Sequence, residues 1–161
     1  MLAIFVIHMI ARRCEFAPWA PSSRGVAQQA FELAKLSSGE RFVDLGSGDG
    51  RVVIAAAKLG CVATGIEISP LMCTIARANA WIHRSPARFV CQDLSDYDLS
   101  DTDVIYVFAS PRGLREKLRA KAEMEMKPGS RLVTCTYPME GWKATEILEG
   151  RRWHTLHLYG R

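Results

Sequence analysis

A glycine-rich turn in the first third of this 161-residue chain constrains its fold more than any other feature. The turn directly follows the apolar run Phe42–Leu45 and leads at once into a second apolar run, Val52–Ala57. This order is typical of the strand–turn–helix unit of nucleotide-binding α/β folds. Residues without a Cβ let the backbone bend tightly and let a ligand approach it closely. The turn contains three of them, Gly46, Gly48 and Gly50.

Two acids in this segment, Asp44 and Asp49, indicate which nucleotide it holds. A pyrophosphate at the start of the following helix would be repelled by Asp49. The dinucleotide fingerprint G-x-G-x-x-G also requires a small residue where Arg51 stands. The acids favour a cationic ligand instead. S-adenosylmethionine fits that description, because it combines a sulfonium, an ammonium and an adenosine and carries no phosphate.

Further acids follow two more predicted strands. The run 61–67 reads as a buried strand that ends in Glu67, where a carboxylate can accept both ribose hydroxyls. A third strand, 87–91, precedes Asp93, which can accept from the adenine amine. Taken singly, Glu67 also suits the first turn of the next helix, and Asp93 suits a loop; together with the turn they predict a ligand site at one sheet edge. The expected cofactor-binding residues are Asp44, Gly46, Ser47, Gly48, Asp49, Gly50, Glu67, Ile68, Asp93 and Leu94.

The rest of the chain alternates between strand and helix patterns. Strands are expected at about 41–45, 62–66, 87–91, 103–108 and 130–136, and helices at about 22–35, 50–58, 70–83 and 111–124. The pairs Ser69-Pro70 and Ser110-Pro111 mark helix starts. Two more β runs follow at about 144–149 and 153–159. The pattern predicts an α/β three-layer sandwich whose mostly parallel, seven-stranded sheet ends in a C-terminal antiparallel hairpin.

Composition agrees with a single catalytic domain at 17–161. The chain is 48% hydrophobic and 24% charged, and its formal net charge of +4 is too mild and too evenly spread to indicate nucleic-acid binding. The five cysteines form no C-x-x-C pair, which indicates reduced, buried thiols in a cytoplasmic protein. His154 and His157 are three apart on a predicted strand and face opposite sides, so no metal is expected. A solvated helix face is expected for the basic series Arg112, Arg115, Lys117, Arg119 and Lys121.

The N-terminal segment 1–16 is set apart by its apolar character. Residues 1–10 are apolar except for His8, and two arginines follow. Crossing a bilayer takes about 20 apolar residues, so this segment is too short, and a signal peptide would carry its positive charge before the apolar run. Three alternatives remain: a helix packed on the domain, an interfacial anchor that gives residues 1–13 peripheral membrane contact, and the remnant of a membrane helix.

The glycine turn and its acids resemble those of class I, seven-β-strand S-adenosylmethionine-dependent methyltransferases. Nearly the whole chain resembles the small archaeal and bacterial protein-lysine methyltransferases, which have mitochondrial relatives that modify the adenine nucleotide translocase and the ATP synthase c-subunit. The matching segments are 17–22, 44–51, 65–67, 98–104, 118–129, 141–142, 154–155 and 158–159. Relatives usually carry a histidine and an acid where this chain has Cys135 and Thr136.

The resemblance implies a Rossmann-like fold, S-adenosylmethionine as cofactor and a protein lysine amine as methyl acceptor. A small-molecule methyltransferase and a non-catalytic S-adenosylmethionine-binding accessory protein are the alternatives. No general base is evident in the sequence. Phe108, at the end of the fourth strand, is expected to line the substrate channel, with Trp19 and Pro21 at its rim. The alternatives are that Phe108 is an ordinary aromatic residue of the sheet core and that Trp19 and Pro21 belong to a connection that packs the first helix onto the sheet. The Asn/Asp-Pro-Pro-Tyr signature of amide and adenine-amine methyltransferases is absent after Phe108.

Overall fold

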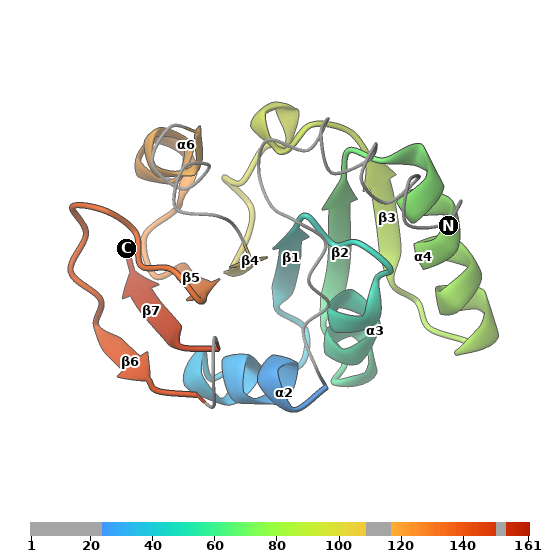
Figure 1. Ribbon diagram of the computed structural model, residues 1–161, viewed down its shortest axis with the longest axis horizontal. Helices are drawn as coiled ribbons and strands as arrows, with labels where there is room; N and C mark the ends of the chain where they lie inside the picture. The colour runs from blue at the N-terminus through green and yellow to red at the C-terminus, as the bar shows by residue number, and fades with distance from the viewer. Residues whose placement is uncertain (1–23, 109–116, 151–153) are drawn as a thin grey trace, which may run out of the picture.

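A seven-stranded sheet organises the computed structural model, which describes residues 24–108, 117–150 and 154–161 (Figure 1). The strands are β1 Arg41–Leu45, β2 Val62–Glu67, β3 Arg88–Cys91, β4 Val104–Phe108, β5 Arg131–Cys135, β6 Glu146–Leu148 and β7 Leu156–Gly160. Their order is β3-β2-β1-β4-β5-β7-β6. The five strands β1 to β5 are mutually parallel, whereas β7 is antiparallel to both β5 and β6. The predicted α/β sandwich with a C-terminal antiparallel hairpin is confirmed.

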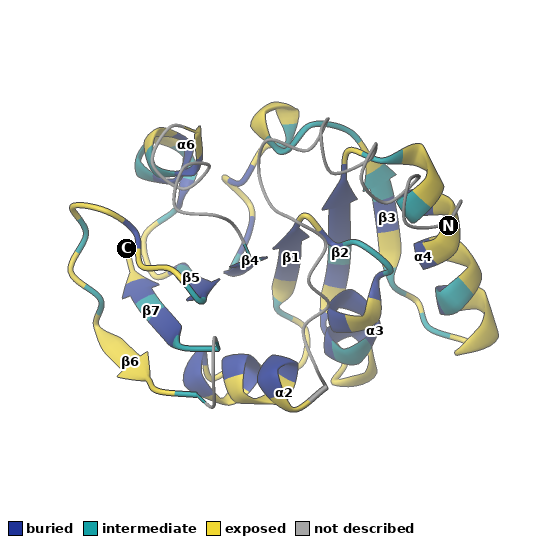
Figure 2. Ribbon diagram, in the orientation of Figure 1, coloured by how far each residue is buried: buried dark blue, intermediate teal, exposed yellow. Residues whose placement is uncertain are grey.

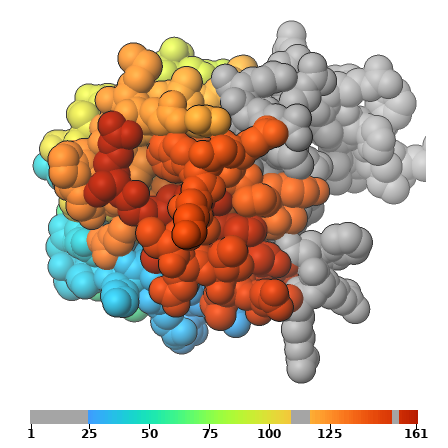
Figure 3. All heavy atoms as spheres, turned by 90° about the vertical axis from the view of Figure 1, so that its left-hand side faces the viewer, coloured from blue at the N-terminus to red at the C-terminus, as the bar shows by residue number. Residues whose placement is uncertain are grey.

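Helices cover the two faces of the sheet and divide the core in two. One core contains side chains of α2 (Arg24–Leu33), α3 (Arg51–Lys58) and α4 (Pro70–Ile82). The other contains side chains of α6 (Arg119–Glu125) and, packed against it, of the short helix η1 (Leu94–Asp96). Figure 3 looks onto the end of the sheet that carries β6 and β7, where the orange and red atoms of the last part of the chain form most of the surface.

Local sequence explains why these elements form where they do. Strand β4, at the sheet centre, is a continuous apolar run, as expected for a parallel strand that is covered on both faces. All of β4 except its last residue is buried. At the start of α4 the Ser69 hydroxyl accepts a hydrogen bond from the Met72 N–H at 3.4 Å, and Pro70 is the first helical residue. The Ser-Pro helix start predicted there is confirmed.

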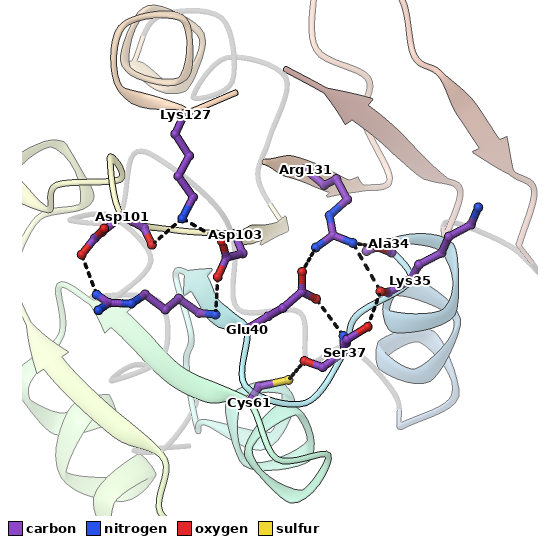
Figure 4. A network of polar contacts seen from close by, with 10 residues as sticks. Ala34, Lys35, Ser37, Glu40, Cys61, Asp101, Asp103, Lys127 and Arg131 are labelled. Atoms are coloured by element: carbon purple, nitrogen blue, oxygen red, sulfur yellow. Dashed lines mark hydrogen bonds and ion pairs between the residues drawn. The ribbon is translucent and has the colours of Figure 1, made fainter. Parts of the chain in front are cut away.

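Polar contacts tie together the N-terminal edge of the sheet (Figure 4). Arg131, at the start of β5, pairs with Glu40, which lies just before β1. Lys127 pairs with Asp103 at 2.7 Å, and Asp103 also accepts a hydrogen bond from the Arg41 N–H at 2.8 Å. These contacts connect the starts of β1, β4 and β5. Because ligands of open α/β sheets bind at the opposite, carboxyl edge, this network serves stability.

Two predictions about individual residues are wrong. Strand β7 begins at Leu156, so His154 precedes the strand instead of sharing it with His157. Cys91 is exposed, not buried, because it is the last residue of β3, and β3 lies at the edge of the sheet. The other cysteines within the described residues, Cys61, Cys73 and Cys135, are buried and free as predicted.

The solvated basic helix face is also wrong at Lys121. This side chain is only 8% exposed, and its Nζ donates to Glu125 at 2.7 Å and to the Ser95 carbonyl at 3.1 Å. Glu125 in turn accepts from the Leu99 N–H at 2.9 Å, so the pair joins α6 to the loop after β3. Lys117 is exposed, and Arg112 and Arg115 lie outside the described residues.

Replacement of Lys121 by alanine is expected to lower the free energy of unfolding by about 1–3 kcal/mol. The change removes both hydrogen bonds of the buried ammonium and leaves the Ser95 carbonyl without this donor. Urea denaturation followed by circular dichroism measures the effect. Lys117→Ala, an exposed change near the start of the same helix, is the matched control, and an equal small loss in both variants would contradict a stabilising role of the buried ammonium.

Several predicted features lie outside the described residues: the first residues of the helix expected at about 22–35, the helix start at Ser110-Pro111, and the segment 1–16. Within the described ranges, no helix is both long enough and apolar enough to cross a membrane.

Candidate active site

The glycine turn after β1 has the backbone geometry that its sequence predicts. Gly46, Gly48 and Gly50 all have positive φ angles, of 87°, 54° and 82°, which residues with a side chain rarely adopt. The N–H groups of Gly46 and Ser47 both donate to the Ile66 carbonyl, at 2.8 and 3.0 Å. The turn is therefore held against the end of β2, and Gly50 leads directly into α3.

Glu67, the last residue of β2, connects the turn to the start of α4. It is buried, and its Oε2 accepts a hydrogen bond from the Gly48 N–H at 3.0 Å. Its Oε1 accepts from the Ser69 N–H at 2.9 Å. Each carboxylate oxygen can accept a second hydrogen bond, so Glu67 retains capacity for a ligand after shaping both loops.

Asp44 is a buried acid inside β1, aligned with Gly65 of β2 and Tyr106 of β4. Only 4% of it is exposed. Burial raises the pKa of its carboxyl to about 8, and the negative charges of Glu67 and Asp49 contribute to that rise. An isolated buried carboxylate is costly unless it is paired. This position is therefore suited to a positively charged group.

Asp49 faces Arg51 within the same turn. Burial opposes ionisation of Asp49, but hydrogen bonds from Arg51 outweigh it and hold the pKa of the carboxyl below its usual value. The Arg51 Nε lies 3.0 Å from both carboxylate oxygens. The Asn79 amide of α4 donates to the Asp49 carbonyl at 2.9 Å and so fixes the backbone of the turn. Asp49 is thus part of the acid cluster, with its charge partly offset.

The acid predicted after the third strand lies one strand further along the same edge. Asp93 follows β3 by two residues, and the neighbouring Gln92 N–H donates to the Glu67 carbonyl at 3.1 Å. The Asp93 side chain caps η1 by accepting from the Ser95 N–H at 2.8 Å. Leu94 is half-buried, and Ile68 is 48% exposed. The predicted acids therefore lie along one edge, with Asp44, Glu67 and Asp49 close enough to influence one another.

One residue at the site was not among the predicted site residues. Gly65 lies within β2, and a Cβ there would stand 2.6 Å from the Ser47 Oγ. A glycine inside a strand pattern signals such a close approach. The Ser47 Oγ is buried and has no hydrogen-bond partner among the described residues. Around Gly46, by contrast, a Cβ would meet nothing within 4 Å, so a ligand can reach this backbone directly. An unpartnered hydroxyl, open backbone and acids fit a cationic nucleoside.

Aromatic and polar side chains gather at the carboxyl ends of β4 and β5. Phe108 is half-buried and aligned with the fully buried Cys135. The His154 Nδ1 lies 4.0 Å from the Cys135 Sγ, so the chain before β7 brings a histidine to the end of β5. Thr136 has a φ of 80°, which is strained for a β-branched residue, and its N–H donates to the Thr155 carbonyl at 2.7 Å.

The other site predictions have different outcomes. Trp19 and Pro21 lie outside the described residues. The structure puts Phe108 at the end of β4, on the same sheet edge as the acids. Across residues 24–108, 117–150 and 154–161, no group of three or more His, Cys, Asp and Glu side chains could hold a metal ion.

Comparison with known proteins identifies the family. The family model of the ANTKMT methyltransferase domain matches residues 44–146, from the first acid of the site to the start of β6. The chain belongs to the ANTKMT methyltransferase family. This methyltransferase is 34% identical over 149 residues to a protein-lysine N-methyltransferase of Saccharolobus islandicus, with 88% of this chain and 92% of that protein covered.

Two further relatives of the methyltransferase bear on its function. The ATP synthase c-subunit lysine N-methyltransferase of Rattus norvegicus is 33% identical over 78% of this chain, which spans 58% of the rat protein. The crystal structure of an RNA methyltransferase from Salinibacter ruber, in complex with S-adenosyl-L-homocysteine, superposes with a TM-score of 0.84 at 30% identity and covers 88% of this chain and 93% of that one. The class I methyltransferase fold and the family resemblance drawn from the sequence are confirmed.

Proposed function

We propose that this methyltransferase transfers methyl groups from S-adenosylmethionine to the side-chain amine of a lysine in a protein. The observation that supports this cofactor is the buried acid Asp44. The raised pKa of its carboxyl indicates that no positive charge lies beside it in the ligand-free protein, so the position is suited to a cationic ligand. Support for the acceptor comes from the relatives in Saccharolobus islandicus and Rattus norvegicus, which are both named as lysine N-methyltransferases.

The proposed cofactor residues divide by what they do. Asp44 offers its charge to the cationic part of the ligand, and the open backbone at Gly46 admits the ligand closely. Glu67 holds Gly48 in place and has remaining lone pairs for the ribose hydroxyls. Asp93 and Leu94 flank the expected adenine position. The proposal keeps the full predicted set, namely Asp44, Gly46, Ser47, Gly48, Asp49, Gly50, Glu67, Ile68, Asp93 and Leu94.

In methyl transfer, the main task of the protein is to hold the two reactants close together and aligned. Bound S-adenosylmethionine supplies an activated methyl group on a positively charged sulfur. Correct alignment of reactants contributes up to about 7–11 kcal/mol in favourable cases. The acceptor lysine must also lose its proton, and a desolvated channel favours the neutral amine. Phe108, half-buried at the end of β4, is proposed as a wall of that channel.

Label transfer tests the acceptor. Incubation of the purified protein and a cell extract with S-adenosylmethionine labelled on its methyl group should place the label in lysine, as shown by acid hydrolysis and amino-acid analysis. The Asp44→Asn variant is the control for background methylation. Label confined to small molecules would favour a small-molecule methyltransferase instead, and cofactor binding without any label transfer would favour the accessory protein. Ribonuclease treatment that removes the label would contradict a protein acceptor.

The N-terminal segment has its own part in the proposal. A cytoplasmic protein that touches a membrane peripherally through residues 1–13 agrees with their apolar run and two arginines. Removal of this segment from the full chain should lower its recovery with the membrane fraction, and unchanged recovery would contradict an anchoring role.

A further inference from the structure

The outer face of α4 exposes a stripe of aliphatic side chains. Leu71, Ile75 and Ile82 are 51%, 38% and 64% exposed. Their spacing of four and seven residues places them above one another on one side of the helix. The opposite side packs on the core through small residues, Cys73, Ala76 and Ala80. Figure 2 shows the outward side of α4 largely in the yellow of exposed residues.

One more apolar residue extends this stripe. Trp81 is 82% exposed beside it. We call these four residues, Leu71, Ile75, Trp81 and Ile82, the α4 surface. Scattered exposed apolar side chains need no explanation, but a contiguous group that runs along a whole helix marks an interaction site.

The charged residues of the segment that carries α4 have a single sign. Residues 68–92 contain no aspartate or glutamate, although the whole chain has 17 acids. The same segment carries Arg77, Arg84 and Arg88, all of them exposed. The segment that carries the α4 surface therefore combines apolar and positively charged side chains, which complements a negatively charged partner.

We propose that the α4 surface lies on an anionic lipid bilayer. A helix that combines an aliphatic stripe, an exposed tryptophan and arginines without acids has the composition of an interfacial membrane contact. The 13 residues of α4 span about 20 Å, so the helix can lie flat on the headgroups along its whole length. A second copy of the chain fits less well, because a stable protein interface takes about 20–30 residues from each partner.

The position of α4 leaves the acceptor side of the active site free. The helix packs on β2 and β3, at the end of the sheet opposite β6 and β7 (Figure 1). Phe108 lies at the end of β4, on the other side of β1. A bilayer against α4 therefore does not cover the end of β4. This contact is separate from the one proposed for residues 1–13, and the two are distinguished by substitution.

Co-sedimentation of the full chain with vesicles tests the proposal. The protein should bind phosphatidylcholine vesicles that contain phosphatidylserine, bind pure phosphatidylcholine vesicles much less, and lose affinity as salt is added. The double variant Trp81→Ser, Ile82→Ser should lower the partition coefficient about tenfold or more. Arg84→Gln with Arg88→Gln should also lower it about tenfold or more. Met124→Ser, at a position 84% exposed on α6, is the matched control and should bind as the wild type does.

Three results would overturn the proposal. The first is equal vesicle binding by the wild type and the Trp81, Ile82 double variant, which would assign the contact to another part of the chain. The second is no preference for anionic vesicles. The third is a wild-type dimer that the double variant converts to a monomer, which would make a second copy the occupant. An unchanged melting temperature and S-adenosylmethionine affinity of the variants confirm that fold and cofactor site are intact.

Discussion

Replacement of Asp44 by asparagine is expected to weaken S-adenosylmethionine binding about a hundredfold or more, because it removes a buried negative charge from the proposed cation site. The amide has nearly the same shape as the carboxyl, so a loss of affinity reports charge and not packing. Isothermal titration calorimetry measures it directly. Asp96→Asn, a change of an exposed acid on η1, is the matched control. Equal affinities of wild type and Asp44→Asn would show that the cofactor site is wrongly placed.

The same acid predicts how binding depends on pH. The pKa of Asp44 is about 8 in the ligand-free protein, so at pH 7 this carboxyl is mostly protonated. A cationic ligand favours the ionised form, and binding at pH 7 should therefore release a proton. Affinity should rise with pH up to about 8 and then level off. Calorimetry at pH 7 in buffers with different ionisation enthalpies detects the released proton, which should be missing in Asp44→Asn.

Stability of the ligand-free protein should show the opposite trend. The folded-state pKa of Asp44, about 8, lies above its ordinary 3.8, so the folded protein holds this proton more tightly than the unfolded chain does. The resulting stabilisation is complete below pH 3.8 and is lost progressively as pH rises from 3.8 to about 8. At pH 9 Asp44→Asn should therefore melt about 5 °C or more above the wild type, and below pH 3.8 the two should be close. A constant difference at all pH values would contradict a buried, protonated Asp44.

Replacement of Gly50 by alanine is expected to lower the free energy of unfolding by about 2–5 kcal/mol, as the sum of backbone strain and overpacking. Gly50 has a φ of 82°, and an added Cβ would lie 2.5 Å from the Cζ of Phe89 and 3.0 Å from the Ala76 Cβ. The Phe89 ring is buried in the core and has little room to move. Urea denaturation at neutral pH measures the loss.

A second glycine separates the two causes. Gly39 has nearly the same φ, 86°, but an added Cβ there would meet nothing within 4 Å. Gly39→Ala should therefore cost only the backbone strain, about 1–2 kcal/mol. The difference between the two variants isolates the crowding against Phe89. Equal losses would show that strain alone explains why a glycine stands at position 50.

Local patterns were sufficient to predict the elements that carry the proposed cofactor residues. The glycine turn predicted the β1–α3 connection, the Ser-Pro pair predicted the start of α4, and acids within or just after three strands predicted the edge that holds Asp44, Glu67 and Asp93. These inferences succeed because each rests on a few adjacent residues whose backbone needs are strict. The mostly parallel sheet with its C-terminal antiparallel hairpin was also predicted, and the matching family model confirms the family resemblance.

Tertiary packing decided what the side chains do within those elements. The surroundings of Lys121 come from a loop some 26 residues earlier, so a charge pattern on the helix alone predicts solvent exposure where the structure shows burial. His154 reaches Cys135 because β7 folds back antiparallel to β5, a pairing that no local pattern reveals. Cys91 is exposed because β3 is an edge strand of the sheet, which only the strand order reveals.

For the acids of the proposed site, the sequence predicts the position and the tertiary structure determines the ionisation and the contacts. The spacing of Asp44 and Glu67 along the chain indicates that both acids lie at the carboxyl edge of the sheet. Their ionisation and contacts depend on structure: burial beside two other acids raises the pKa of Asp44 to about 8, and Glu67 accepts N–H groups from two separate loops. Sequence determines which groups are available, because backbone geometry is local. Only the folded chain determines their charge and partners, because desolvation and proximity arise from residues far apart in sequence.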